Sequence, residues 1–223
     1  MPQLTNKKIV LYIFFFIIFG TFNNKNLDIM EFSKINEITV SGLNLEENFK
    51  FAKRLDILKI ENLFLIEKIK LKKLIETNNS IEKYYIFKKY PSSLEIKIAQ
   101  TEPLAYLSKN GKIFYLGSNS KLVDAENREK KLPFIFGDID IQKFFDLKKL
   151  IDNSSLDYKK IKNLFFFPSK RWDIEMDSGI LIKLPIEKLE ESLNLSLDII
   201  KNDEFKHIRI IDLRQNHQVI LNE

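Results

Sequence analysis

The chain contains no cysteine among its 223 residues. This absence excludes disulfide bonds, thiol nucleophiles and cysteine-ligated metal sites, and it suits a secreted or periplasmic protein that needs no oxidative folding. Histidine is almost as scarce, because the sequence has only 2, His207 and His217, with too few potential ligands near them to complete a metal site. The composition therefore gives no support to a thiol enzyme or a metalloprotein.

Glycine is also rare, with 6 residues in the chain. Gly42, Gly111 and Gly179 lie at expected turns, so no glycine-rich loop remains to hold a phosphate group. Acidic pairs such as Asp138 with Asp140 are easy to find among 31 acidic residues and carry little information. We find no pattern typical of catalysis or of cofactor binding, and we expect a protein that is not an enzyme.

The net charge of +5 raises the question of a polyanionic partner. Arginine, which nucleic-acid surfaces favour, supplies only 5 of the 36 basic residues, and the lysines are spread along the chain. The pattern favours a lysine-rich solvated surface over nucleic-acid binding. One denser group leaves contact with lipid head groups open, namely Lys68, Lys70, Lys72 and Lys73.

Long apolar segments are lacking except for one, the uncharged run from Ile9 to Phe22. Basic residues precede it, an order shared by signal peptides and membrane anchors, but no small-residue cleavage site follows it. As a helix its 14 residues span about 21 Å against about 30 Å of hydrocarbon, and flanking residues with snorkelling lysines extend it. We expect an uncleaved anchor over residues 9–26, with a cleaved signal peptide or a buried helix as alternatives.

The charges around the run indicate its orientation. Lys7, Lys8 and the amino terminus precede it, which favours a short cytoplasmic tail over residues 1–8 and the bulk of the chain outside. The expected membrane-facing side chains are Ile9, Leu11, Phe14, Phe15, Phe16, Ile17, Ile18, Phe19 and Phe22.

The next part of the chain mixes strand and helix patterns. Its predicted elements are a strand at 38–41, a helix over about 45–55, a helix over about 65–76, and strands at 84–90 and 94–98. Gly42 ends the first strand, and Asn44 is placed to cap the first helix, whose apolar side chains recur at helical spacing, namely Leu45, Phe49, Ala52 and Leu55. This order predicts helices covering one face of a small sheet.

Beyond Pro103 the pattern becomes mostly β. The dipeptides Asn110-Gly111 and Ser178-Gly179 each lie between two strand-like segments and indicate tight hairpins. The other predicted elements are an amphipathic helix at 186–200 and two last strands at 207–214 and 218–221. The fold class we expect is α+β, with a mostly antiparallel second domain and flanking helices.

In this order the segments resemble the FtsQ/DivIB family of bacterial cell-division proteins. The motifs that carry the resemblance are ITVSGL at 38–43, KKYPSSLEIKIAQTEPLAYL at 88–107, NGKIFYL at 110–116, KLPFIFGD at 131–138, RWDIEMDSGILIKLP at 171–185 and IDLR at 211–214. The resemblance implies a POTRA domain over residues 32–102 and the family's β domain over residues 103–223.

The resemblance also implies a role. It is that of a single-pass inner-membrane protein, enriched at the division septum, which acts as a scaffold without enzymatic activity or cofactor. The implied partners are FtsB- and FtsL-like division proteins, with an FtsK-like protein contacting the POTRA domain. The alternatives are another POTRA-bearing envelope protein that chaperones polypeptides for secretion or outer-membrane assembly, and a membrane-anchored periplasmic enzyme.

The last predicted strand is the expected partner site. Such a strand tends to lie at a sheet edge, where unpaired N–H and C=O groups accept another strand, and the family's corresponding strand is implied to capture FtsB in this way. Two alternatives stay open, an internal ion pair for Arg214 and core packing for about half of the apolar residues. The residues expected to contribute are Ile211, Leu213, Arg214, Gln215, Val219, Ile220 and Leu221.

Overall fold

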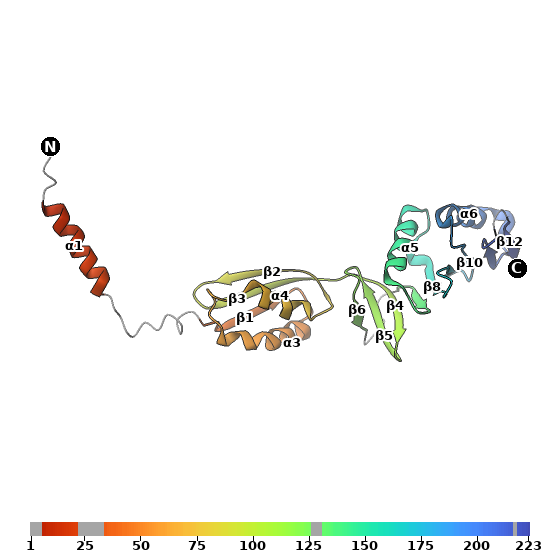
Figure 1. Ribbon diagram of the computed structural model, residues 1–223. Coiled ribbons are helices and arrows are strands. Elements are labelled where there is room, and N and C mark those ends of the chain that lie inside the picture. The colour runs from red at the N-terminus through yellow and green to blue at the C-terminus, as the bar shows by residue number, and fades with distance from the viewer. Residues whose placement is uncertain (1–5, 22–33, 126–130, 216–217) are drawn as a thin grey trace, which may run out of the picture. The chain divides into compact units, whose positions relative to one another are not determined.

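The structure is a computed structural model that describes residues 6–21, 34–125, 131–215 and 218–223. Phe22, His217, and the parts of the predicted tail and anchor at residues 1–5 and 22–26 lie outside the described residues. The chain forms two compact units (Figure 1). The first comprises the chain up to Ile75 together with Tyr84–Ile98, and the second comprises Glu76–Lys83 together with Ala99–Glu223.

The helix α1 (Asn6–Thr21) contains residues 9–21 of the predicted anchor. Its large apolar side chains from Ile9 to Phe19 are exposed, apart from Ile18, which is half-buried. Among the described residues, no helix combines the length and the apolar character needed to cross a membrane.

The first unit contains a three-stranded sheet in the order β1-β3-β2. Its strands are β1 (Glu37–Ser41), β2 (Ile81–Lys89) and β3 (Ser93–Gln100), and its helices are α3 (Leu45–Leu55), the 3-10 helix η1 (Asp56–Ile60) and α4 (Lys68–Glu76). β1 is parallel to β3. The order strand, helix, helix, strand, strand that the sequence predicts is confirmed.

Helix α3 begins where the sequence indicates, but only part of its predicted apolar stripe is buried. The Asn44 side chain accepts a hydrogen bond from the backbone N–H of Glu47 at 2.8 Å and caps the helix. Of the predicted apolar stripe, Leu55 is buried and Ala52 is half-buried, but Leu45 and Phe49 are exposed, and the core receives Phe51 instead. Phe49 and Phe51 are two residues apart, about 200° around the helix, so only one of them can point at the sheet.

The second unit is built on a nine-stranded sheet in the order β12-β11-β10-β9-β8-β7-β4-β5-β6. The two predicted hairpins, β4–β5 and β9–β10, are confirmed as antiparallel pairs. Three other pairs, β4–β7, β7–β8 and β10–β11, are parallel. The strands are β4 (Pro103–Lys109), β5 (Lys112–Gly117), β6 (Leu122–Asp124), β7 (Phe134–Phe136), β8 (Ile161–Phe166), β9 (Trp172–Met176), β10 (Leu181–Lys183), β11 (Ile210–Asp212) and β12 (Ile220–Asn222).

Helices α5 (Ile141–Asn153) and α6 (Leu189–Lys201) share one core with this sheet. Helix α5 contributes Phe144, Leu147 and Ile151, and α6 contributes Leu193 and Leu197. The sheet contributes a row of apolar residues to the same core. Its register aligns them across seven strands, namely Leu107, Ile135, Leu164, Ile174, Ile182, Ile211 and Leu221. The core therefore extends across the sheet as far as its last strand.

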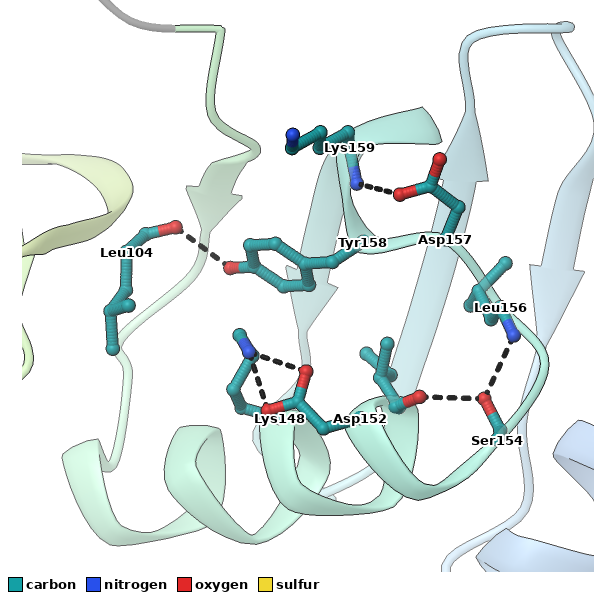
Figure 2. Close-up of polar contacts among 9 residues, drawn as sticks. Leu104, Lys148, Asp152, Ser154, Leu156, Asp157, Tyr158 and Lys159 are labelled. Carbon is teal, nitrogen blue, oxygen red and sulfur yellow. Dashed lines mark hydrogen bonds and ion pairs between the residues drawn. The ribbon is translucent and has the colours of Figure 1, made fainter.

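A polar cluster fixes the segment after α5 to strand β4 (Figure 2). The phenol of Tyr158 donates a hydrogen bond to the carbonyl oxygen of Leu104 at 2.8 Å. Lys148 lies over the Tyr158 ring, 4.5 Å from its centroid, and binds both carboxylate oxygens of Asp152 at 2.5 and 2.6 Å. Burial raises the pKa of Tyr158, so the phenol keeps the proton that it donates. The geometry indicates a structural role for this cluster.

Candidate partner-binding edge

Strand β12 lies at one edge of the nine-stranded sheet (Figure 1). It pairs antiparallel with β11, so that Leu221 lies opposite Ile211 and Ile220 lies opposite Asp212. No strand in the described part of the chain pairs with its other side. An edge strand presents a row of backbone N–H and C=O groups with which another chain can pair. The predicted edge position of the last strand is confirmed.

The hydrogen bonds of β11 determine which backbone groups of β12 point outward. The N–H of Leu181 donates to the carbonyl of Arg209 at 2.7 Å, and the N–H of Leu213 donates to the carbonyl of Lys183 at 2.9 Å. In the parallel ladder between β10 and β11, this pattern directs the N–H and C=O of Ile211 toward β10. The neighbouring residues of β11 then direct their groups toward β12.

The same alternation continues along β12. Ile220 lies opposite Asp212, whose backbone groups face β12, so the N–H and C=O of Ile220 face inward, toward β11. The backbone groups of Leu221 therefore point to the open edge. Val219 lies just before β12, and continuing the alternation of the strand by two residues would direct its groups the same way. A further strand would therefore find its backbone partners at Val219 and Leu221.

The apolar side chains expected at this site divide between core and surface. Ile211 and Leu213 are buried in the core, which was the alternative for about half of the set, and their side chains are not accessible to a partner. Leu221 is half-buried against the same core. Val219 and Ile220 are 38% and 48% exposed, and they are the apolar side chains that the edge presents.

Arg214 forms the internal ion pair that the sequence left open. Its Nε donates to both carboxylate oxygens of Asp212, at 2.8 and 3.0 Å, and its Nη2 donates to Oδ2 at 2.5 Å. This hydrogen bonding lowers the pKa of Asp212 and raises that of Arg214. An acidic partner residue would share a guanidinium that Asp212 already holds.

The sequence reasoning missed the charged row beside this edge. Lys183 lies opposite Asp173 on one side and opposite Asp212 on the other. Burial raises the pKa of Asp173, although Arg171, whose Nε donates to it at 3.3 Å, opposes the shift. The alternation of charged and core residues in each strand was a usable signal, but the register that aligns the three strands cannot be read from the sequence. Within the described ranges no acidic or histidine cluster could hold a metal ion.

The ion pair predicts a pH-dependent loss of stability in Arg214→Gln. The pKa of Asp212 is lower in the folded protein than in the unfolded chain. The ion pair therefore stabilises the folded protein at pH values above the unfolded pKa, and this stability is lost as the pH falls through the folded pKa. We expect Arg214→Gln to lower the free energy of unfolding by about 1 kcal/mol at pH 7, because the Arg214 side chain is 40% exposed and solvent screens the pair. The difference from wild type should shrink toward pH 3.

Denaturant unfolding followed through Trp172, the single tryptophan, measures this difference. Lys206→Gln is the matched control, because it breaks a fully surface-exposed ion pair with Asp203 at 3.0 Å and should change little. An equal deficit for Arg214→Gln at pH 7 and pH 3 would show that the loss does not come from the pair.

Comparison with known proteins identifies the class. The model of the family "Cell division protein FtsQ/DivIB, C-terminal" matches residues 98–214, which contain most of the sheet described above. The chain belongs to the FtsQ/DivIB family of cell-division proteins, as its motifs indicated.

Individual relatives carry the same description. The cell division protein FtsQ of Rickettsia bellii is 23% identical over 175 residues, covering 72% of this chain and 60% of that protein. The FtsQ protein of Rickettsia typhi is 25% identical over 202 residues, covering 83% of this chain and 71% of the relative. This chain therefore spans less than two thirds of the Rickettsia bellii protein.

One solved structure aligns with part of the chain. It is the major extracytoplasmic domain of the bacterial cell division protein DivIB from Geobacillus stearothermophilus. The alignment covers 46% of this chain and 92% of that one, with 14% identity and a TM-score of 0.35.

Proposed function

We propose that this protein is a non-enzymatic scaffold of the division septum that captures an FtsB-type partner by strand addition at β12. The observation that supports this most is the position of β12 at the sheet edge, with the backbone groups of Leu221 directed outward. An extended partner segment would add a tenth strand there, held by main-chain hydrogen bonds. An FtsL-type protein is proposed as a further partner of the same edge.

The side chains of Val219 and Ile220 give this interface its apolar contact. They are the exposed apolar residues of the edge, and burying them against a partner strand would add to the main-chain pairing. Arg214 and Gln215, both exposed, lie just after β11 and supply polar contacts beside it. Ile211 and Leu213 support the edge from within the core.

The first unit is proposed to act as the POTRA domain, over residues 32–102. Its strand, helix, helix, strand, strand order supports this assignment, and it would contact an FtsK-type protein. Helix α1, with its flanking residues, is proposed to hold the chain in the inner membrane as a single-pass anchor. Its exposed apolar side chains and the lysines in its first turn, Lys7 and Lys8, support that position, with residues 1–8 cytoplasmic and the two units periplasmic.

A fluorescent fusion of the full chain tests the division role. We expect midcell enrichment in dividing cells, because a septal scaffold must accumulate where its partners assemble. A fusion of residues 1–33 alone is the control, and it should label the envelope uniformly if the folded units direct the protein to the septum. Uniform signal from the full-length fusion would contradict the proposal.

A further inference from the structure

The first unit has an exposed aromatic and apolar cluster at one end. The rings of Phe64 and Tyr90 stack with centroids 4.6 Å apart and planes inclined by 25°, and both residues are exposed. Leu65, next to Phe64, is 71% exposed. Lys88 donates a hydrogen bond to the carbonyl of Phe64 at 3.4 Å, which places a basic residue at the same end. The loop before α4 and the turn between β2 and β3 therefore present one amphipathic surface.

This surface lies where the chain from α1 joins the unit. Lys34, the first residue described after α1, forms a bridge with Asn62 in the loop that carries Phe64. The N–H of Asn36 donates to the carbonyl of Ser92 at 2.8 Å, in the turn that follows Tyr90. Both loops of the amphipathic surface are thus hydrogen-bonded to the beginning of the unit.

The connection to α1 is short. Residues 22–33 join Thr21 to Lys34, and covalent geometry limits that connection to about 45 Å at full extension. If α1 is in the bilayer, the end of the unit that carries Phe64 and Tyr90 is the end attached to the membrane by this tether.

The charge of this end complements an anionic surface. Residues 56–73, which lead through the loop into α4, contain five lysines against Asp56, Glu61 and Glu67, a net charge of +2. Two of these lysines form ion pairs, Lys59 with Asp56 and Lys70 with Glu61. Tyrosine rings favour the head-group level of a bilayer, phenylalanine and leucine side chains bury at its boundary with the acyl chains, and lysines beside them attract anionic lipids by about 1 kcal/mol each. The combination matches an anionic lipid surface better than a purely apolar partner groove.

We propose that the surface formed by Phe64, Leu65, Tyr90 and the neighbouring lysines docks the first unit on the anionic head groups of the membrane that holds α1. This inference rests on the proposed anchor. Docking holds the unit against the bilayer rather than leaving it free at the end of its tether.

The opposite end of the unit offers a matched control. Leu45, at the first position of α3, is 90% exposed, more than Leu65. The 11 residues of α3 lead from Leu45 back toward the Phe64 loop, a distance of about 15 Å along the helix. Exposure alone would make Leu45 the more lipid-accessible of the two leucines, whereas docking favours Leu65.

The experiment uses the full chain, whose lack of cysteine allows one introduced thiol to be labelled alone. Leu65→Cys and Leu45→Cys carry an environment-sensitive fluorophore, in vesicles of phosphatidylcholine with phosphatidylglycerol that contain a lipid-borne quencher. We expect at least twofold stronger quenching at position 65 than at position 45. The difference should fall in pure phosphatidylcholine and in about 1 M salt, where the screening length is about 3 Å.

Other outcomes separate the two proposals. If the vesicles float and the protein does not float with them, both the anchor and the docking are overturned. Flotation with the protein but equal quenching at both positions overturns the docking alone. If lipid leaves the fluorophore at position 65 exposed to water and only an added partner protein shields it, the surface belongs to that partner. This result also overturns the proposal.

Discussion

Replacing Gly137 by alanine is expected to lower the free energy of unfolding of the second unit by about 3 kcal/mol or more. Gly137 follows β7 with φ +104, and a Cβ atom there would lie 2.0 Å from the backbone carbonyl oxygen of Phe166 at the end of β8. The left-handed backbone costs an L-residue about 1–2 kcal/mol, and forcing two central strands apart adds about 1–3 kcal/mol. The clash is with backbone, so no side-chain rotation relieves it.

Denaturant unfolding followed through Trp172 reports this loss directly. The Trp172 ring is buried with its centroid 4.6 Å from that of Phe166, the residue that the new methyl group would displace. Gly179→Ala separates backbone strain from the clash, because Gly179 also has a positive φ, +86, but nothing lies within 4 Å of its added Cβ. We expect about 1–2 kcal/mol for that control. If both variants lose the same amount, the close approach of Gly137 to β8 does not matter.

The central strands around Gly137 were missing from the sequence prediction. β7 has three residues, too few for alternation to be recognised, and it is a strand because β4 and β8 pair with it in parallel. Helix α5 carried a usable signal in the spacing of Phe144, Leu147 and Ile151, which all face the core. Parallel pairing joins segments distant in the chain, and no local pattern encodes it.

Hairpins were predicted well because their signals are local. Asn110 and Gly111 have φ angles of +52 and +74, the left-handed pair that a two-residue hairpin turn requires, and those two residue types tolerate it. Helix α3 shows the opposite case. Its cap was evident from Asn44, but both of its faces carry apolar residues, so which face is buried depends on the sheet.

The candidate site divides in the same way. Its edge position followed from its place after the other predicted strands, whereas the fate of each side chain depended on the register. Ile211 and Leu213 alternate with Asp212, which shows that they share a face but not that helices cover it. The outward phase of Leu221, from which that of Val219 is extrapolated, required the hydrogen bonds between β10 and β11.

That phase gives the sharpest prediction for partner capture. Val219 immediately precedes β12, and the alternation of that strand, continued by two residues, directs its N–H away from β11. Val219→Pro removes this N–H and puts a ring where a partner strand would pair, so we expect the dissociation constant for an FtsB-type partner to rise about 100-fold. The β11–β12 ladder does not use that N–H, so the stability measured through Trp172 should change by less than about 0.5 kcal/mol. Affinity measurement with the purified full chain in detergent tests both expectations.

Two neighbouring variants isolate the backbone contribution. Val219→Ala keeps the N–H and should weaken binding less than tenfold, because it removes only part of one exposed side chain. Ile220→Pro removes an N–H that faces β11, so it should weaken the sheet edge itself and lower both stability and binding. Strand addition at β12 requires this order of effects. Proline at residue 219 should weaken binding without lowering stability, whereas proline at residue 220 should lower both. Wild-type affinity in Val219→Pro would mean that the partner binds elsewhere.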